Sequence, residues 1–186
     1  MAQDTLGRIE KAIAALAAEV SALREQVDAL RGGDGALTSR EIQEFLDQYR
    51  AGESLGETSI GAWIATCKVE CLRGGLRNVQ LREGSHARLL EARLKELGGT
   101  PHCELPESVT DGFFGVLASA EKTDLEKLEC FFSQVDSEQV LRQLGEKADR
   151  MGRDPETQAL LRTIAQDERS TIEFFTQACQ LLNKPA

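Results

Sequence analysis

Four glutamates of this chain lie in the middle of otherwise apolar helical stripes, and a histidine follows one of them at helical spacing. The glutamates are Glu53, Glu83, Glu121 and Glu168, and His86 lies three residues after Glu83. A carboxylate on a buried face is unfavourable unless another group compensates its charge. Four such residues indicate one shared partner, and a bound metal pair is the partner that fits best.

The ligand types indicate which metals would bind. His86 shares a helix face with Glu83, because residues three apart are neighbours on a helix. A Glu-x-x-His pair from one helix, with glutamates from others, is the ligand set of carboxylate-bridged dinuclear bundles. Carboxylate oxygen with imidazole nitrogen suits iron or manganese, and zinc is also compatible. We therefore expect two iron or two manganese ions.

Apolar periodicity predicts the helices that would position these residues. Stripes at helical spacing predict long helices over 38–67, 70–97 and 108–134, and one that starts after Asp154-Pro155. A shorter helix is predicted at about 137–151. No run shows strand alternation, so the predicted class is all-α.

Distances along the sequence predict that the four glutamates lie at one level of an antiparallel bundle. Glu53 and Glu83 each lie 15 residues from Lys68, in the predicted first turn. Counting from the later predicted turns places Glu121 and Glu168 within one residue of that level. Residues equally far from a connecting turn lie side by side in antiparallel helices, so all four carboxylates should meet.

Short motifs around these residues resemble the ferritin-like superfamily, nearest to its rubrerythrin and demethoxyubiquinone-hydroxylase branches. The resemblance covers about residues 38–182 and implies a four-helix bundle with a dinuclear metal site. The motifs are Ala51-Gly52-Glu53, Arg82-Glu83-Gly84-Ser85-His86, Ala118-Ser119-Ala120-Glu121 and Asp167-Glu168-Arg169-Ser170-Thr171.

The last motif departs from the family, which usually has histidine where this chain has Thr171. One metal would still have a full set of ligands in Glu53, Glu83, His86 and Glu121. The second would have Glu121 and Glu168 with a bridging Glu83, and Thr171 or Asp124 as weaker ligands. The alternative is a metal-free polar network, in which burial keeps some carboxylates protonated.

An N-terminal segment stands apart from this bundle. Apolar residues alternate at three- and four-residue spacing through four heptads of residues 4–31, with branched residues in the first core position. That pattern favours a parallel two-stranded coiled coil, and the alternative is a helix packed on its own domain. The expected organisation is a coiled-coil oligomerisation helix at 1–31, a glycine-rich linker at 32–37 and the bundle at 38–186.

Composition limits the partners and the compartment. The 186 residues carry a net charge of −9, which argues against nucleic acid and anionic membranes as partners. No apolar run approaches the roughly 20 residues of a membrane span. Five cysteines without a CxxC pair fit a reduced cytoplasmic setting.

Two functions are consistent with these features. The first is an oxidoreductase that uses two metals to handle oxygen, peroxide or iron(II). The second is a non-catalytic helical module with a degenerate metal site, dimerised by the coiled coil. Gly52, Gly56 and Gly61 flank Glu53 and would either leave space for a small substrate or allow close helix packing.

Overall fold

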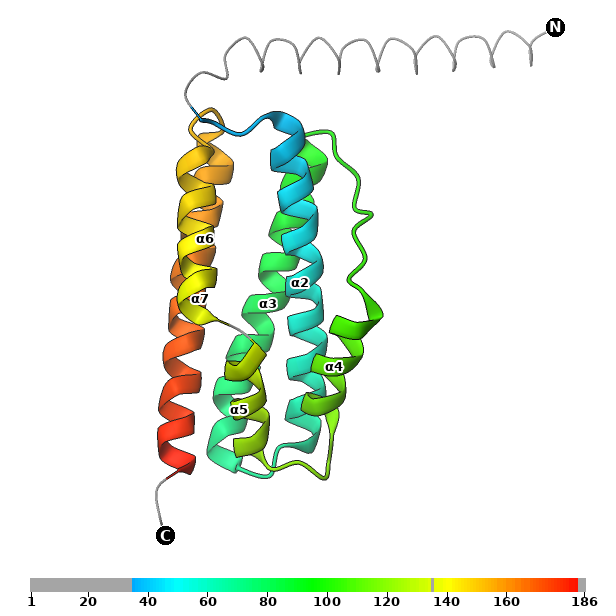
Figure 1. The fold of residues 1–186 in the computed structure, drawn as a ribbon, viewed down its shortest axis with the longest axis vertical. Coiled ribbons are helices and arrows are strands. Elements are labelled where there is room, and N and C mark those ends of the chain that lie inside the picture. The colour runs from blue at the N-terminus through cyan, green and yellow to red at the C-terminus, as the bar shows by residue number, and fades with distance from the viewer. Residues whose placement is uncertain (1–34, 135, 184–186) are drawn as a thin grey trace, which may run out of the picture.

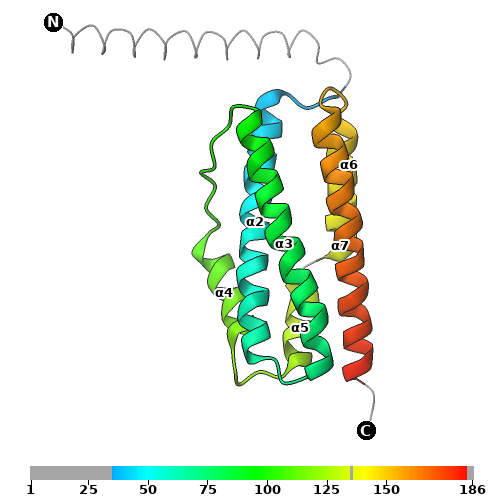
Figure 2. The same ribbon diagram turned by 180° about the vertical axis from the view of Figure 1, so that it is seen from behind.

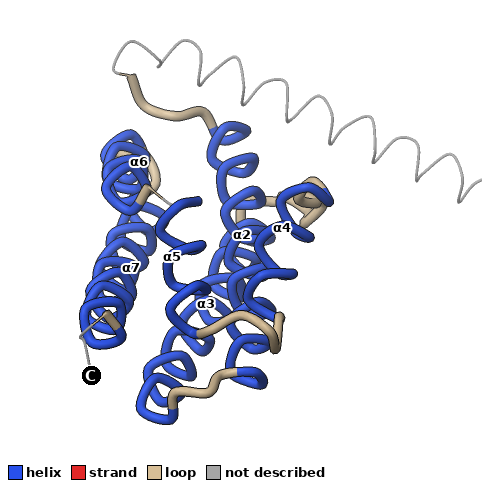
Figure 3. Tube along the Cα trace, turned by 60° about the horizontal axis from the view of Figure 1, so that its bottom comes forward, coloured by secondary structure: helices blue, strands red, loops and turns tan. Residues whose placement is uncertain are grey.

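The computed structural model describes residues 35–134 and 136–183, which form helices joined by loops (Figure 3). No strand occurs in these ranges, which confirms the all-α class. The predicted coiled coil at 1–31 lies outside the described residues, as do residues 32–34 of the predicted linker. The helices are α2 (Ser39–Thr66), α3 (Glu70–Glu96), α4 (Glu107–Ala118), α5 (Asp124–Gln134), α6 (Ser137–Arg150) and α7 (Pro155–Leu182).

Local capping explains where the predicted long helices begin. The Thr38 hydroxyl accepts a hydrogen bond from the amide of Glu41, whose carboxylate accepts one from the Thr38 amide. This capping box makes Thr38 the N-cap of α2. Asp154 caps α7 by accepting from the amide of Thr157, with Pro155 in the first turn. The predicted bounds of α2, α3 and α6 and the predicted start of α7 are confirmed to within about one residue.

The predicted continuous helix over 108–134 is wrong. Residues 119–123 are non-helical and separate α4 from α5. Thr123 and Glu126 form a second capping box, in which each backbone amide donates to the other side chain. The Ser119 hydroxyl accepts from the amide of Glu121, which stabilises the intervening turn. The apolar stripe therefore continues across a break that its periodicity does not reveal.

The connection between α3 and α5 runs the length of the molecule. In Figure 1, α2 descends and α3 rises beside it, after which residues 97–106 and α4 lead back down along α2. The helices α5 and α6 then rise one after the other, and α7 descends. Figure 2 shows the same path from behind. Because α4 begins partway along this return path, counting from Ser108 does not give a level in the bundle.

Two hydrophobic cores fill the interior. One joins α2, α3, α6 and α7, and the other joins α2, α3, α4, α5 and α7. Between them on α2 lies Glu53, and the corresponding positions on α3 and α7 are also polar. Fully buried members of the two cores include, respectively, Leu46, Leu90, Met151 and Leu161, and Trp63, Leu76, Leu128 and Phe175.

The end of the predicted linker is docked on the bundle. Gly35 has a φ of 74°, which favours glycine, and Leu37 is buried. The Leu37 amide donates to the carbonyl of Arg150 at the end of α6. Residues 35–37 therefore belong to the folded domain. Among the described helices, none combines the length and apolar character required to cross a membrane.

Candidate metal centre

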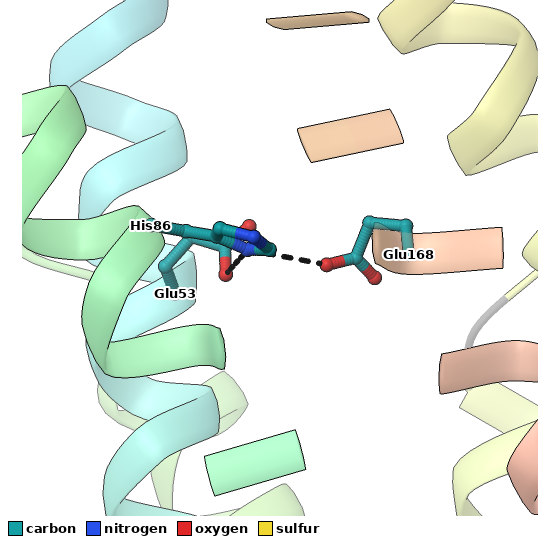
Figure 4. Close-up of side chains that lie close together, drawn as sticks. All are labelled: Glu53, His86 and Glu168. Atoms are coloured by element: carbon teal, nitrogen blue, oxygen red, sulfur yellow. Dashed lines mark hydrogen bonds and ion pairs between the residues drawn. The ribbon is translucent and has the colours of Figure 1, made fainter. Parts of the chain in front are cut away.

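Side chains from three helices converge between the two cores. Figure 4 shows Glu53 from α2, His86 from α3 and Glu168 from α7 pointing toward one another. One ligand-type atom from each lies within 4.8 Å of the others. The side chains of Glu53 and His86 are each only 4% exposed, and that of Glu168 is 14% exposed. These positions match the prediction that the three residues meet in the interior.

The two ring nitrogens of His86 face different carboxylates. Nδ1 lies 3.2 Å from Oε2 of Glu53 and 3.6 Å from Oε1 of Glu168. Nε2 lies 3.2 Å from Oδ2 of Asp167, whose side chain is 40% exposed. A carboxylate on the outer nitrogen orients an imidazole and fixes its tautomer, as it does in many metal sites. Nδ1 is therefore the nitrogen available to a metal between Glu53 and Glu168.

Glu83 of α3 belongs to the same polar layer, which is the level between the two cores where Glu53, His86 and Glu168 lie. Its side chain packs against α2, where a Cβ at Gly56 would collide with the Glu83 carboxylate. Burial raises the pKa of Glu83 well above its ordinary value, and the negative charges of Glu53 and Glu168 raise it further. Glu53, Glu83, His86 and Glu168 are called the carboxylate–histidine cluster below.

Without a metal, protons compensate the charge of this cluster. Burial lowers the pKa of His86, but hydrogen bonds to Glu168, Glu53 and Asp167 outweigh it and raise the pKa to about 10. Burial raises the pKa of Glu168, although His86 opposes this shift. At neutral pH the metal-free site therefore holds an imidazolium among carboxyl groups, a charge that a divalent cation can replace.

The other predicted oxygen ligands lie elsewhere. Glu121 is exposed in the turn between α4 and α5, so its predicted place in the polar layer is wrong. Asp124 is buried, but its carboxylate accepts from the Trp63 indole at 2.8 Å and from the amides of Lys68 and Val69 at 2.9 Å. Burial raises the pKa of Asp124, but these hydrogen bonds lower it overall. Asp124 thus fastens α5 to the α2–α3 turn.

Two buried polar atoms beside the cluster have no hydrogen-bond partner among the described residues. They are Oε1 of Glu168 and Oγ1 of Thr171. Buried polar atoms in native proteins nearly always form hydrogen bonds. Among the described residues, Oε1 of Glu168 forms none and has only the ion pair with Nδ1 of His86 at 3.6 Å, so it remains able to accept a ligand. The donor set suits one iron or manganese ion well. A second ion would depend on Glu83, Glu168 and the weak donor Thr171.

Two site residues were not predicted from the sequence. Asp167 precedes Glu168 and reaches the outer nitrogen of His86. Tyr49 lies one helical turn before Glu53, and burial and the charges of Glu53 and Glu168 raise its pKa. The position of Tyr49 on the Glu53 stripe was a signal available in the sequence, but an aromatic residue there is indistinguishable from a core residue.

Comparison with known proteins gives no relative from which a function could be transferred. No family model, curated protein or solved structure matches the chain. The geometry of the carboxylate–histidine cluster is therefore the basis for the function proposed below.

Proposed function

We propose that this chain is a ferritin-like bundle that binds iron or manganese in its carboxylate–histidine cluster. The main support is the convergence of Glu53, His86 and Glu168 from three helices within 4.8 Å. Further support comes from Oε1 of Glu168, which is buried without a hydrogen bond to any described residue and lies 3.6 Å from Nδ1 of His86. Burial of several acidic groups together is costly, and a bound cation offsets that cost.

The path of the chain supports the ferritin-like part of this proposal. Bundles of that class have one long crossover connection, which makes their second and third helices parallel. Here residues 97–123 form such a connection, and α5 and α6 together run in the direction of α3 (Figure 1). The break between α5 and α6 is a departure from a continuous third helix.

The ligand set suggests unequal affinity for two ions. Glu53, His86 and Glu168 would hold the first ion, with Glu83 as a further oxygen ligand. A second ion would share Glu83 and Glu168, because no described residue of α5 or α6 joins the buried ligand group. We therefore expect one tightly bound ion and a weaker second one.

The chain's own residues would position and shield the metal. Asp167 would orient His86 from outside the cluster, and the two apolar cores pack above and below it. When bound, iron or manganese would supply redox chemistry toward oxygen, peroxide or iron(II). The chain would thus act as an oxidoreductase.

Metal analysis tests this proposal. The full chain would be loaded anaerobically with iron(II) or manganese(II), desalted and analysed for metal. We expect one to two ions per chain for the wild type and a loss of both after combined Glu83→Ala and His86→Ala substitution. Glu121→Gln is the matched control, because an exposed carboxylate outside the layer should leave the metal content unchanged. Wild-type protein that retains no metal would contradict the proposal.

The alternative is a non-catalytic helical module. It is supported by the carboxylate partners of both His86 ring nitrogens, which satisfy the ring without a metal. A wild-type chain without metal, together with little loss of stability in the double variant, would favour this alternative.

A further inference from the structure

A cavity of about 350 Å³ adjoins the carboxylate–histidine cluster. Residues of α2, α3, α4, α5 and α7 line it, and α4 with the preceding loop forms one wall. Most of the lining is apolar, with three phenylalanines, Phe113, Phe131 and Phe175, from three helices. The volume lies in the range of small-molecule sites, which are typically apolar with a few polar groups.

The polar groups of this cavity come from Glu83, Glu168 and Thr171. Thr171 is only 3% exposed, and its hydroxyl has no hydrogen-bond partner among the described residues. Leaving a buried hydroxyl unsatisfied is unfavourable. A ligand group that pairs with Oγ1 of Thr171 would remove that cost.

Three features restrict the chemistry of the occupant. Phenylalanine rings favour a flat aromatic molecule, because aromatic pairs gain energy beyond the area they bury. The described lining contains no lysine, arginine or histidine, so no cationic side chain of the cavity would pair with an anion. The hydroxyl of Thr171 both donates and accepts, so it pairs well with another hydroxyl.

We propose that this cavity binds a neutral aromatic alcohol, with its ring among the phenylalanines and its hydroxyl on Thr171. This inference deepens the proposed function, because it names the substrate class of the site next to the metal. The glycines of α2 fit this assignment in different ways. Gly52 lines the cavity and has open space where a Cβ would project, whereas Gly56 and Gly61 permit close contact with Glu83 and Gln80.

Binding of three probes to the full chain tests the ligand class. The probes are 2-naphthol, naphthalene and 2-naphthoate, measured by ligand-observed NMR at neutral pH. We expect 2-naphthol to bind most tightly and naphthalene about tenfold more weakly, since one hydrogen bond is lost. Thr171→Val should remove this difference. Naphthoate that binds as tightly as naphthol, or no binding of naphthol, would overturn the inference.

A pair of glycine variants tests the location. Gly52→Leu adds a large side chain to the lining of the cavity, and Gly74→Leu is the matched control at an exposed position of α3. Neither position has an atom within 4 Å of an added Cβ, so both variants should fold. We expect Gly52→Leu to weaken 2-naphthol binding at least tenfold and Gly74→Leu to leave it unchanged. Equal affinities of the two variants would overturn the assignment to this cavity.

Metal content, measured on the same samples, separates this inference from the proposed function. Gly52→Leu should load iron or manganese like the wild type, because it fills the cavity and leaves the ligands in place. Loading without naphthol binding overturns only the ligand assignment. The expected naphthol pattern in a chain that binds no metal supports the cavity's ligand class and overturns the metal proposal.

Discussion

At the scale of single residues, the site is organised around His86. One ring nitrogen lies between Glu53 and Glu168, and the other faces Asp167. Burial alone would favour the neutral imidazole, but the surrounding carboxylates raise the pKa of His86 to about 10. The same nitrogen that contacts two carboxylates is the one that a metal would take. Proton and metal therefore compete for one position.

The metal-free protein should lose stability as the pH rises from about 6.5 to about 10. The pKa of His86 is about 10 in the folded chain against an ordinary value of 6.5, so its contribution is complete below 6.5 and is lost through 10. The raised pKa values of Glu83 and Glu168 act in the same direction. Urea unfolding at several pH values would measure the free energy of unfolding.

The variant His86→Gln should reduce this pH dependence, because it removes the imidazole whose pKa is raised. A free energy of unfolding that stays constant from pH 6.5 to 10 in the metal-free wild type would contradict the protonated state described for His86.

At the scale of elements, the segment after α3 departs most from the sequence prediction. Residues 97–106 are held to α2 by Asp47, whose carboxylate accepts from the amides of His102 and Cys103. Further along, Asp124 holds the start of α5 to the α2–α3 turn. Each of these buried carboxylates joins a helix to backbone amides about 55 residues away. Neither contact leaves a pattern in the local sequence.

The variant Asp124→Ala should destabilise the protein by about 3 kcal/mol, because it leaves the Trp63 indole and two backbone amides without their acceptor. Thermal and urea unfolding would measure the loss, with the exposed Asp111→Ala as control. Metal content should be unchanged, since Asp124 lies outside the cluster. Loss of metal in a variant that remains folded would show instead that Asp124 is a ligand.

At the scale of the whole molecule, the polar layer divides the interior into two cores. Each core is built from at least four helices, so the layer is held from both sides. The net charge of −9 gives the whole chain a negative field, which would favour the approach of cations over anions. The described helices thus hold the acidic side chains of Glu53, Glu83 and Glu168 together in the interior of the bundle.

We expect the full chain to be a parallel dimer joined through residues 4–31, as the heptad pattern predicts. A chain that begins at residue 34 should be monomeric and should retain its helical content, because Leu37 and the residues after it pack on the bundle. Light scattering measures the mass of both forms. A truncated chain that still forms dimers would contradict dimerisation through this segment.

The sequence by itself determined the helical class, the bounds of α2, α3 and α6, the start of α7, and the approach of Glu53, Glu83 and His86. Helical periodicity and capping residues are local signals. Where a short turn such as 67–69 joins two helices, counting residues from the turn shows which positions of the two helices lie side by side. Only the tertiary structure decided that residues 97–123 return along the bundle, which moved Glu121 to the surface. It also revealed the cavity and the role of Asp167, because long-range contacts depend on the path of the backbone and leave no spacing to count.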